Sequence, residues 1–236
     1  MHIINFILIG CTIILLLFLV HSILPTYYNK HYNRNITKKT KGKKRIMLTF
    51  DDGPDPRYTN DLLDILKDNN VRATFFVVAN DAKDNPDIIN RMLEDGHEVA
   101  LHSLEHKNAW LYSYFYTKKD FLESLNIMKK LGVDVKHYRP PWGHTNIFSA
   151  AFARKHNLKI ILWSVMAEDW EKDATVEVIV ERLKRRTGGN SIICLHDSGE
   201  NSGGAEGAPR RTIDALKIAL PELKASGFRF ITPERS

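Results

Sequence analysis

Apolar and polar positions follow two patterns along this chain. Residues 3–24 form an almost unbroken apolar run without Asp, Glu, Lys or Arg, and it includes FILIGCTIILLLFLV. From residue 45 onward, short apolar runs alternate with longer segments whose apolar residues recur at helical spacing, as do Phe121, Leu125 and Met128. The short runs predict strands over 45–50, 73–79, 98–101, 159–165, 191–195 and 228–231. The longer segments predict helices over 59–68, 86–95, 118–131, 146–156, 175–186 and 212–225.

This alternation predicts an α/β fold, in which a parallel sheet is covered by helices. Six or seven strand–helix units in one domain favour a barrel closed by its strands over an open, doubly wound sheet. No G-x-G-x-x-G or Walker motif follows the first strand, and the Gly-rich stretch 198–209 lacks the Lys-Ser/Thr of a phosphate-binding loop. We therefore interpret residues 198–209 as an ordinary loop.

The apolar run at the N-terminus is about 20 residues long, which is enough to cross a bilayer as a helix. A cleaved signal peptide is the competing interpretation, but its apolar region is normally shorter, and no small-x-small site precedes LPTYYNK. We expect residues 1–24 to be an uncleaved transmembrane anchor, residues 25–44 a linker, and residues 45–236 one folded domain.

Charge divides the chain at nearly the same place. The net charge is +6, but eight of the 34 basic residues and none of the 28 acidic residues lie at or before Arg45. The remainder is slightly acidic and shows no basic face for nucleic acid. The basic linker suits anionic lipid headgroups or an anionic wall polymer, and it also fits a flexible, solvated spacer. Cys11 in the apolar run and Cys194 in a predicted strand are not expected to form a disulfide.

Titratable residues recur directly after the predicted strands. The carboxyl ends of parallel strands meet at the same edge of the sheet, where α/β enzymes place their reactive groups. The residues found there are Asp51, Asp52, His102, His106, Arg139, Asp169, His196 and Asp197. A functional site at this edge is the expectation that follows.

His102 and His106 are four residues apart in LHSLEH. On a helical turn, this spacing points both imidazoles the same way, as two ligands of one metal ion require. With a carboxylate from a neighbouring strand end, they would form a site for one divalent cation that leaves positions open for water and substrate. Zinc is the default, and cobalt, nickel or manganese would also fit two nitrogens and an oxygen.

Five motifs in this order, TFDDGP, HSLEH, RPPWG, EDW and LHD, resemble those of the polysaccharide deacetylase family. This family comprises metal-dependent carbohydrate esterases that share the chitooligosaccharide-deacetylase homology domain. The resemblance covers about residues 45–231 and implies a distorted (β/α) barrel. It also implies hydrolysis of N-acetyl groups on a polysaccharide.

The resemblance further assigns the catalytic groups. It implies that Asp51 is the general base and that Arg139 tethers and tunes it. His196 would be the general acid that protonates the leaving amine, and Asp169 the carboxylate that orients and charges this histidine. The ligands of the metal ion would be Asp52, His102 and His106.

The substrate contacts implied by the resemblance are the backbone N–H of Trp142, as oxyanion donor, and Leu195, which would help line a pocket for the acetyl methyl group. Two departures from the family pattern stand out: Met166 replaces an acid three residues before Asp169, and Trp142 replaces a frequent tyrosine. We expect Met166 to alter hydrogen bonding around Asp169. Trp142 should alter only the wall of the groove.

The sequence also suggests positions or roles for five other residues. Arg72 is either a second cationic neighbour of the base or a surface ion-pair partner. Trp163 and Trp170 are expected in the core, and Trp110 against a sugar. His97 is expected to be structural.

Three functions remain open on the sequence alone. The first is removal of N-acetyl groups from N-acetylglucosamine in peptidoglycan, a chitin-like polymer or poly-N-acetylglucosamine. The second is a catalytically silent carbohydrate-binding domain of the same fold, and the third is amide hydrolysis on a non-sugar substrate. A complete set of catalytic residues favours the first, but the motifs do not select the polymer or the oligomeric state.

The membrane orientation rests on two conflicting arguments. A polysaccharide substrate outside the cell predicts an extracytoplasmic domain on a single-pass anchor. The positive-inside rule predicts the opposite, because the basic cluster follows the apolar run. We expect the domain to face outward.

Overall fold

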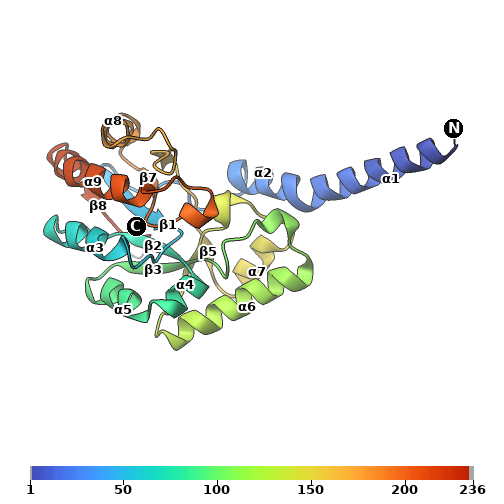
Figure 1. Ribbon diagram of the computed structural model, residues 1–236, viewed down its shortest axis with the longest axis horizontal. Coiled ribbons are helices and arrows are strands. Elements are labelled where there is room, and N and C mark those ends of the chain that lie inside the picture. The colour runs from blue at the N-terminus through green and yellow to red at the C-terminus, as the bar shows by residue number, and fades with distance from the viewer. Residues whose placement is uncertain (1, 234–236) are drawn as a thin grey trace.

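A curled parallel sheet forms the centre of the molecule in the computed structural model, which describes residues 2–233 (Figure 1). Its strands are β1 (Arg45–Asp51), β2 (Thr74–Val78), β3 (Glu98–Ser103), β4 (His137–Tyr138), β5 (Lys159–Ile160), β6 (Val165–Met166), β7 (Ile192–His196) and β8 (Arg229–Phe230). The strand order is β5-β4-β3-β2-β1-β7-β6, and β8 pairs with the beginning of β1. Every pairing between these strands is parallel.

Helices cover the outside of this sheet (Figure 1). They are α3 (Thr59–Asp68), α4 (Ala79–Asp84), α5 (Pro86–Glu94), α6 (Tyr114–Lys130), α7 (Ser149–Lys155), α8 (Val176–Arg186) and α9 (Ala208–Ala225). Each longer helix buries one apolar stripe, as α3 does with Leu62, Ile65 and Leu66. This burial against the sheet accounts for the helical period seen in the sequence.

Side-chain alternation along the strands separates two apolar clusters. Leu48 and Phe50 of β1 belong to the large cluster, which also holds the buried stripes of the helices. Met47 belongs to a second, smaller cluster that includes Ile192 of β7. Because successive side chains of a strand point to opposite faces, Asp51 shares the face of Met47 and lies away from the helices. The carboxyl end of β1 therefore presents its carboxylate to the interior of the curled sheet.

The predicted barrel is confirmed in its class and in its parallel order, but some elements differ from the expectation. The strand predicted over 159–165 is two short strands, β5 and β6, which lie at opposite ends of the strand order. Strand β4 and helix α4 were not expected. The sheet is thus curled without a continuous strand closing it.

The N-terminal segment is one long helical run that projects from the domain (Figure 1). It consists of α1 (His2–Phe18), the π-helical turn η1 (Leu19–Ile23) and α2 (Leu24–His31). By length and composition, this run could cross a membrane, a property that a signal sequence shares.

Part of the segment predicted as a basic linker pairs with the domain. After α2, Thr37 pairs with Ile161 and Lys39 pairs with Ser191. The amide of Thr37 donates to the Ile160 carbonyl at 3.0 Å, and the amide of Leu162 donates to the Thr37 carbonyl at 2.9 Å. Backbone pairing with the domain therefore begins before residue 45.

Candidate active site

The residues expected at the strand ends do converge at one edge of the sheet. Asp51 is the last residue of β1, His102 lies in β3, and His196 is the last residue of β7. They line a single cavity together with Asp52 and His106. The expected helical turn between the two histidines is wrong, because His102 is on a strand and His106 follows in a loop at a φ of 50°.

Asp52, His102 and His106 form a tight cluster. The Nε2 atoms of His102 and His106 lie 3.3 Å and 2.9 Å from Oδ1 of Asp52. Three possible ligand atoms therefore point at one place. Burial alone would raise the pKa of Asp52, but its side-chain interactions with His102 and His106 outweigh burial and hold that pKa well below its usual range.

The surroundings of this cluster suit a divalent cation. Nδ1 of His102 lies 2.7 Å from the backbone carbonyl of Arg139, and a carbonyl oxygen can only accept a hydrogen bond. Nδ1 therefore carries the proton, which leaves the lone pair of Nε2 available to a cation, as in metal-binding histidines. Two imidazole nitrogens and one carboxylate oxygen match the ligands of open, catalytic zinc sites.

The backbone is strained where it places these groups. Asp52 has a φ of 78° and Trp142 a φ of 54°, in addition to the positive φ of His106. Residues other than glycine rarely adopt this region, and such strain concentrates at functional sites. Gly199 approaches the cluster closely, since a Cβ at this position would meet Oδ2 of Asp52 at 2.7 Å.

Asp51 is held in place by a buried arginine. Nη1 of Arg139 donates to Oδ1 of Asp51 at 2.6 Å and to Oγ1 of Thr49 at 2.7 Å. Arg139 is fully buried, and its other guanidinium nitrogens donate to the backbone carbonyls of Ile161 and Leu162. The second oxygen of Asp51 lies 3.4 Å from the Cys194 thiol, so it faces the cavity side of β7.

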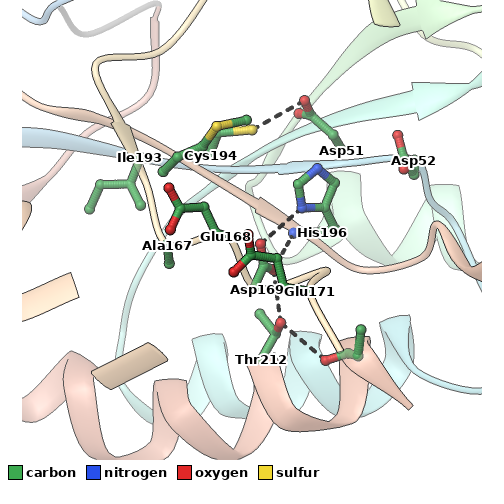
Figure 2. A network of polar contacts seen from close by, with 12 residues as sticks. Asp51, Asp52, Ala167, Glu168, Asp169, Glu171, Ile193, Cys194, His196 and Thr212 are labelled. Carbon is green, nitrogen blue, oxygen red and sulfur yellow. Dashed lines mark hydrogen bonds and ion pairs between the residues drawn. The ribbon is translucent and has the colours of Figure 1, made fainter. Parts of the chain in front are cut away.

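His196 is fixed by Asp169. Its Nδ1 donates to Oδ1 of Asp169 at 3.0 Å, and its backbone amide donates to Oδ2 at 2.9 Å. The hydroxyl of Thr212 in α9 donates to the same Oδ2 at 2.8 Å. Figure 2 shows the imidazole between Asp169 on one side and Asp51 on the other.

The charge of His196 follows from these contacts. Burial lowers the pKa of His196, but the Asp169 carboxylate outweighs this effect and raises the pKa to about 10. The imidazole is therefore protonated at neutral pH and can give a proton to a group in the cavity.

Met166 was expected to alter the hydrogen bonding around Asp169. The Asp169 carboxylate nevertheless has its donors, because Thr212 supplies one.

The cavity wall differs in part from the expectation. Leu195 is fully buried in the large apolar cluster, whereas its neighbours Cys194 and His196 line the cavity. Because side chains alternate along β7, Leu195 cannot share their face. Trp163 and Trp170, expected in the core, also line the cavity. Cys194 was missed, although alternation from His196 would have pointed to it.

Trp142 also lines the cavity. Its indole is 44% exposed, and the ring centroid is 4.5 Å from that of His106. Met166 lines the cavity as well, so the place of the expected acid is apolar.

The structure also places the other residues for which a role was predicted. Arg72 is exposed and lies beside Gly96, so it is not a neighbour of the base. Trp110 stacks on His144 at 3.8 Å between ring centroids, and its indole N–H donates to Thr26 of the N-terminal helix. His97 is structural as expected, since its Nδ1 accepts from the backbone amide of Ala73 at 3.1 Å.

One buried acid at the site was given no role. Asp197 follows His196 and accepts from Oγ1 of Thr59 at 2.6 Å, which ties the end of β7 to the beginning of α3. Burial raises the pKa of Asp197 to about 7. Its carboxylate also lies against Gly53, where any Cβ would come within 2.2 Å of it.

The site thus combines a fixed carboxylate, a protonated imidazole and a cluster able to hold a cation around one cavity. A carboxylate can accept a proton from water, and a protonated imidazole can donate one to a leaving group. A cation stabilises the negative charge that develops on a carbonyl oxygen. This combination is suited to hydrolysis of an acyl bond.

Comparison with known proteins agrees with this chemistry. The family model for polysaccharide deacetylases matches residues 38–161. A peptidoglycan-N-acetylglucosamine deacetylase of Bacillus cereus is 33% identical over 192 residues, which cover 80% of this chain and 86% of that protein. A chitooligosaccharide deacetylase of Sinorhizobium fredii is 32% identical over 202 residues, which cover 84% of this chain and 94% of that protein.

A solved structure shares the fold. The crystal structure of the Bc1960 peptidoglycan N-acetylglucosamine deacetylase, in complex with 4-naphthalen-1-yl-N-oxidanyl-benzamide, is similar with a TM-score of 0.77 at 29% identity. The match covers 85% of this chain and 92% of that one. The strand-end motifs, the curled parallel sheet and these relatives together establish that the chain belongs to the polysaccharide deacetylase family.

Proposed function

We propose that the protein removes N-acetyl groups from N-acetylglucosamine residues of peptidoglycan, releasing acetate and leaving a free amine on the sugar. The observation that carries this proposal is the placement of Asp51 and His196 on the wall of one cavity beside the Asp52–His102–His106 cluster. The names of the relatives support the substrate class, since peptidoglycan and chitooligosaccharides carry the same acetamide group.

The proposed cofactor is one divalent cation held by Asp52, His102 and His106, with zinc favoured by the two nitrogens and one oxygen of this set. When bound, such a cation polarises a carbonyl and lowers the pKa of water in the site. Arg139 holds the carboxylate of Asp51 turned toward the cavity through the contact at 2.6 Å. Asp51 accepts the proton of the attacking water.

The other half of the reaction needs an acid, because an amide anion is a very poor leaving group. Asp169 holds the proton on His196, and His196 transfers it to the amine nitrogen as the carbon–nitrogen bond breaks. The backbone N–H of Trp142 is the proposed donor to the oxyanion. The indole rings of Trp142, Trp163 and Trp170 would contact the sugar or its acetyl group in the cavity.

Acetate release tests the proposal. We expect release from peptidoglycan, loss of release with a chelator, and recovery when Zn²⁺ is restored. Chitooligosaccharides and poly-N-acetylglucosamine serve as comparison substrates. Binding of these polymers without acetate release, at any metal supplied, would reject catalysis in favour of a silent carbohydrate-binding domain.

We further propose that the N-terminal helix is retained as a single-pass membrane anchor and that the domain faces outward, where the wall polymer lies. A protease added to intact cells would then remove the domain. Complete protection of the domain would place it on the cytoplasmic side.

A further inference from the structure

The N-terminal helix is fastened to the domain by hydrogen bonds over two turns. Oγ of Ser22 donates to the Trp110 carbonyl at 2.8 Å, and the Ile147 amide donates to the His21 carbonyl at 3.0 Å. Thr26 and Asn29, both buried, bond to Thr145. The helix therefore leaves the domain in a fixed direction, close to Phe18 and Val20.

An exposed apolar surface surrounds the point where the helix leaves. Leu111 and Phe115 are 81% and 79% exposed, and Ile147 and Tyr114 are 47% and 45% exposed. We call these four residues the exit patch. A groove whose lining is mostly apolar joins the exit patch to the apolar helix, and it is lined by Leu17, Phe18, Val20, Leu111 and Ile147 together with Trp110, Tyr112, His21 and Ser113.

The position of the exit patch along the helix matches the edge of a bilayer. Helix α1 has 17 residues, none of them buried, and at 1.5 Å per residue it spans about 26 Å. The hydrocarbon core of a bilayer is about 30 Å thick. If α1 crosses the hydrocarbon core, the boundary between that core and the headgroups lies near residues 18–20, at the level of the exit patch.

Side chains near the exit patch have the character of a membrane interface. Trp110 contacts Phe18 at 6.1 Å between ring centroids, and Tyr114 contacts Phe115 at 5.6 Å. Aromatic residues of this kind gather at headgroup level. Lys118, one turn further along α6, is exposed and can reach anionic headgroups.

We propose that the side chains of the exit patch insert into the bilayer that α1 crosses and hold the catalytic domain directly at the membrane surface. The domain is then held at one height and one orientation. The cavity serves N-acetylated glycan that lies next to the membrane, because in the described residues α1 continues through η1 and α2 to the domain without a flexible spacer that would let it reach further. This inference rests on the retained anchor proposed above, but not on catalysis.

Photo-crosslinking to lipid tests the exit patch. Leu111 and Phe115 are each replaced by p-benzoylphenylalanine in the full chain, in nanodiscs of phosphatidylglycerol and phosphatidylethanolamine. Leu93 on α5 and Ile218 on α9, which are 39% and 47% exposed, receive the same replacement as matched controls. We expect lipid adducts at positions 111 and 115 at a yield several-fold above that at positions 93 and 218, measured by intact mass.

Three results would overturn the proposal. Equal adduct yields at all four positions would mean that the domain stands clear of the bilayer. Adducts to a second copy of the chain instead of lipid would make the exit patch a self-association surface. An intact mass from cells that lacks the apolar run would remove the anchor. Acetate release by the wild-type chain is measured in parallel, so that failure of the patch and failure of the proposed activity are separated.

Discussion

At the scale of single residues, Asp51 and Asp52 are adjacent in the chain but contact different side chains. Asp51 ends β1 and bonds to the buried Arg139, whereas Asp52 adopts a φ of 78° and turns its carboxylate to His102 and His106. The positive φ of Asp52 is what separates the two carboxylates. This geometry supports the proposed division between proton acceptor and metal ligand.

Replacement of each carboxylate by its amide tests that division. We expect Asp51→Asn to keep the metal and to lower turnover by ~10²–10⁴-fold, as the loss of a general base does. Asp52→Asn should weaken metal binding, because an anionic ligand becomes neutral, and excess cation should restore part of the activity. The metal content and the acetate release of the purified variants are measured. If both variants change both quantities equally, the proposed division of roles between Asp51 and Asp52 is contradicted.

The raised pKa of His196 predicts how kcat/KM depends on pH. An acid that must be protonated loses activity as the pH rises through its pKa, and the Asp169 carboxylate is what raises this pKa to about 10. Asp169→Asn removes that negative charge and should move the alkaline limb of kcat/KM ~1–3 units toward lower pH. Thr212→Val, which removes the hydroxyl's bonds to Asp169 and to the Ala208 carbonyl but keeps the charge, should shift the limb less. An alkaline limb unmoved by Asp169→Asn would show that His196 is not the acid.

The sequence located most site residues because they follow predictable strands. Strand ends and motifs together identified Asp51, Asp52 and His196 as members of one site, and the structure brings them to one cavity. Leu195 was misassigned because its side chain alternates to the helix-facing side of β7. The loop conformation of His106 depends on a positive φ that no spacing rule predicts.

At the scale of elements, every strand of five residues or more was predicted, whereas the two-residue strands were predicted only in part: β8 lies within the strand expected over 228–231, and β4 was missed. Strand β4 has two residues, and its period-2 pattern is too short to recognise. Residues 159–165 form one apolar run, yet their backbone bonds go to different neighbours, β4 for the first part and β7 for the second. Only tertiary contacts decide this division.

The loop after β7 supports the Asp52–His102–His106 cluster through a glycine. A Cβ on Gly199, at a φ of 112°, would lie 2.7 Å from Oδ2 of Asp52, whereas a Cβ on Gly203, at a φ of 105°, has no atom within 4 Å. Both alanine variants carry similar backbone strain, but only Gly199→Ala displaces the carboxylate. We expect Gly199→Ala to lower Zn²⁺ affinity by the ~10–100-fold typical of misoriented ligands. Gly203→Ala should leave the affinity close to that of the wild type.

Titration of chelator-treated protein with Zn²⁺ measures both glycine variants. The comparison isolates the contact, since unfolding caused by strain alone would affect the two proteins alike. Unchanged affinity in Gly199→Ala, or an equal loss in both, would mean that the loop does not position Asp52.

At the scale of the whole molecule, the N-terminal helix and the catalytic domain form one connected structure. Nζ of Lys30 donates to the Trp142 carbonyl at 3.1 Å, and Thr145, three residues further, bonds to Thr26 in both directions. The loop that carries the proposed oxyanion donor thus rests on the helix that carries the anchor. Disturbance of the helix contact should therefore reach the active site.

Thr26→Val tests this connection. The Thr26 hydroxyl accepts from the Trp110 indole at 2.8 Å and from the Thr145 amide at 2.9 Å, and it donates to the Thr145 carbonyl at 2.8 Å. Valine keeps the volume but leaves these buried groups unsatisfied, at a cost of about 1–3 kcal/mol each. We expect faster hydrogen exchange of the amides over 142–147 in the full chain and a few-fold loss of acetate release. Thr12→Val, which removes only an exposed bond to Leu8 within α1, is the matched control and should change neither quantity. If exchange over 142–147 is the same in both variants, the helix does not support this loop, and truncation of the anchor should leave catalysis intact.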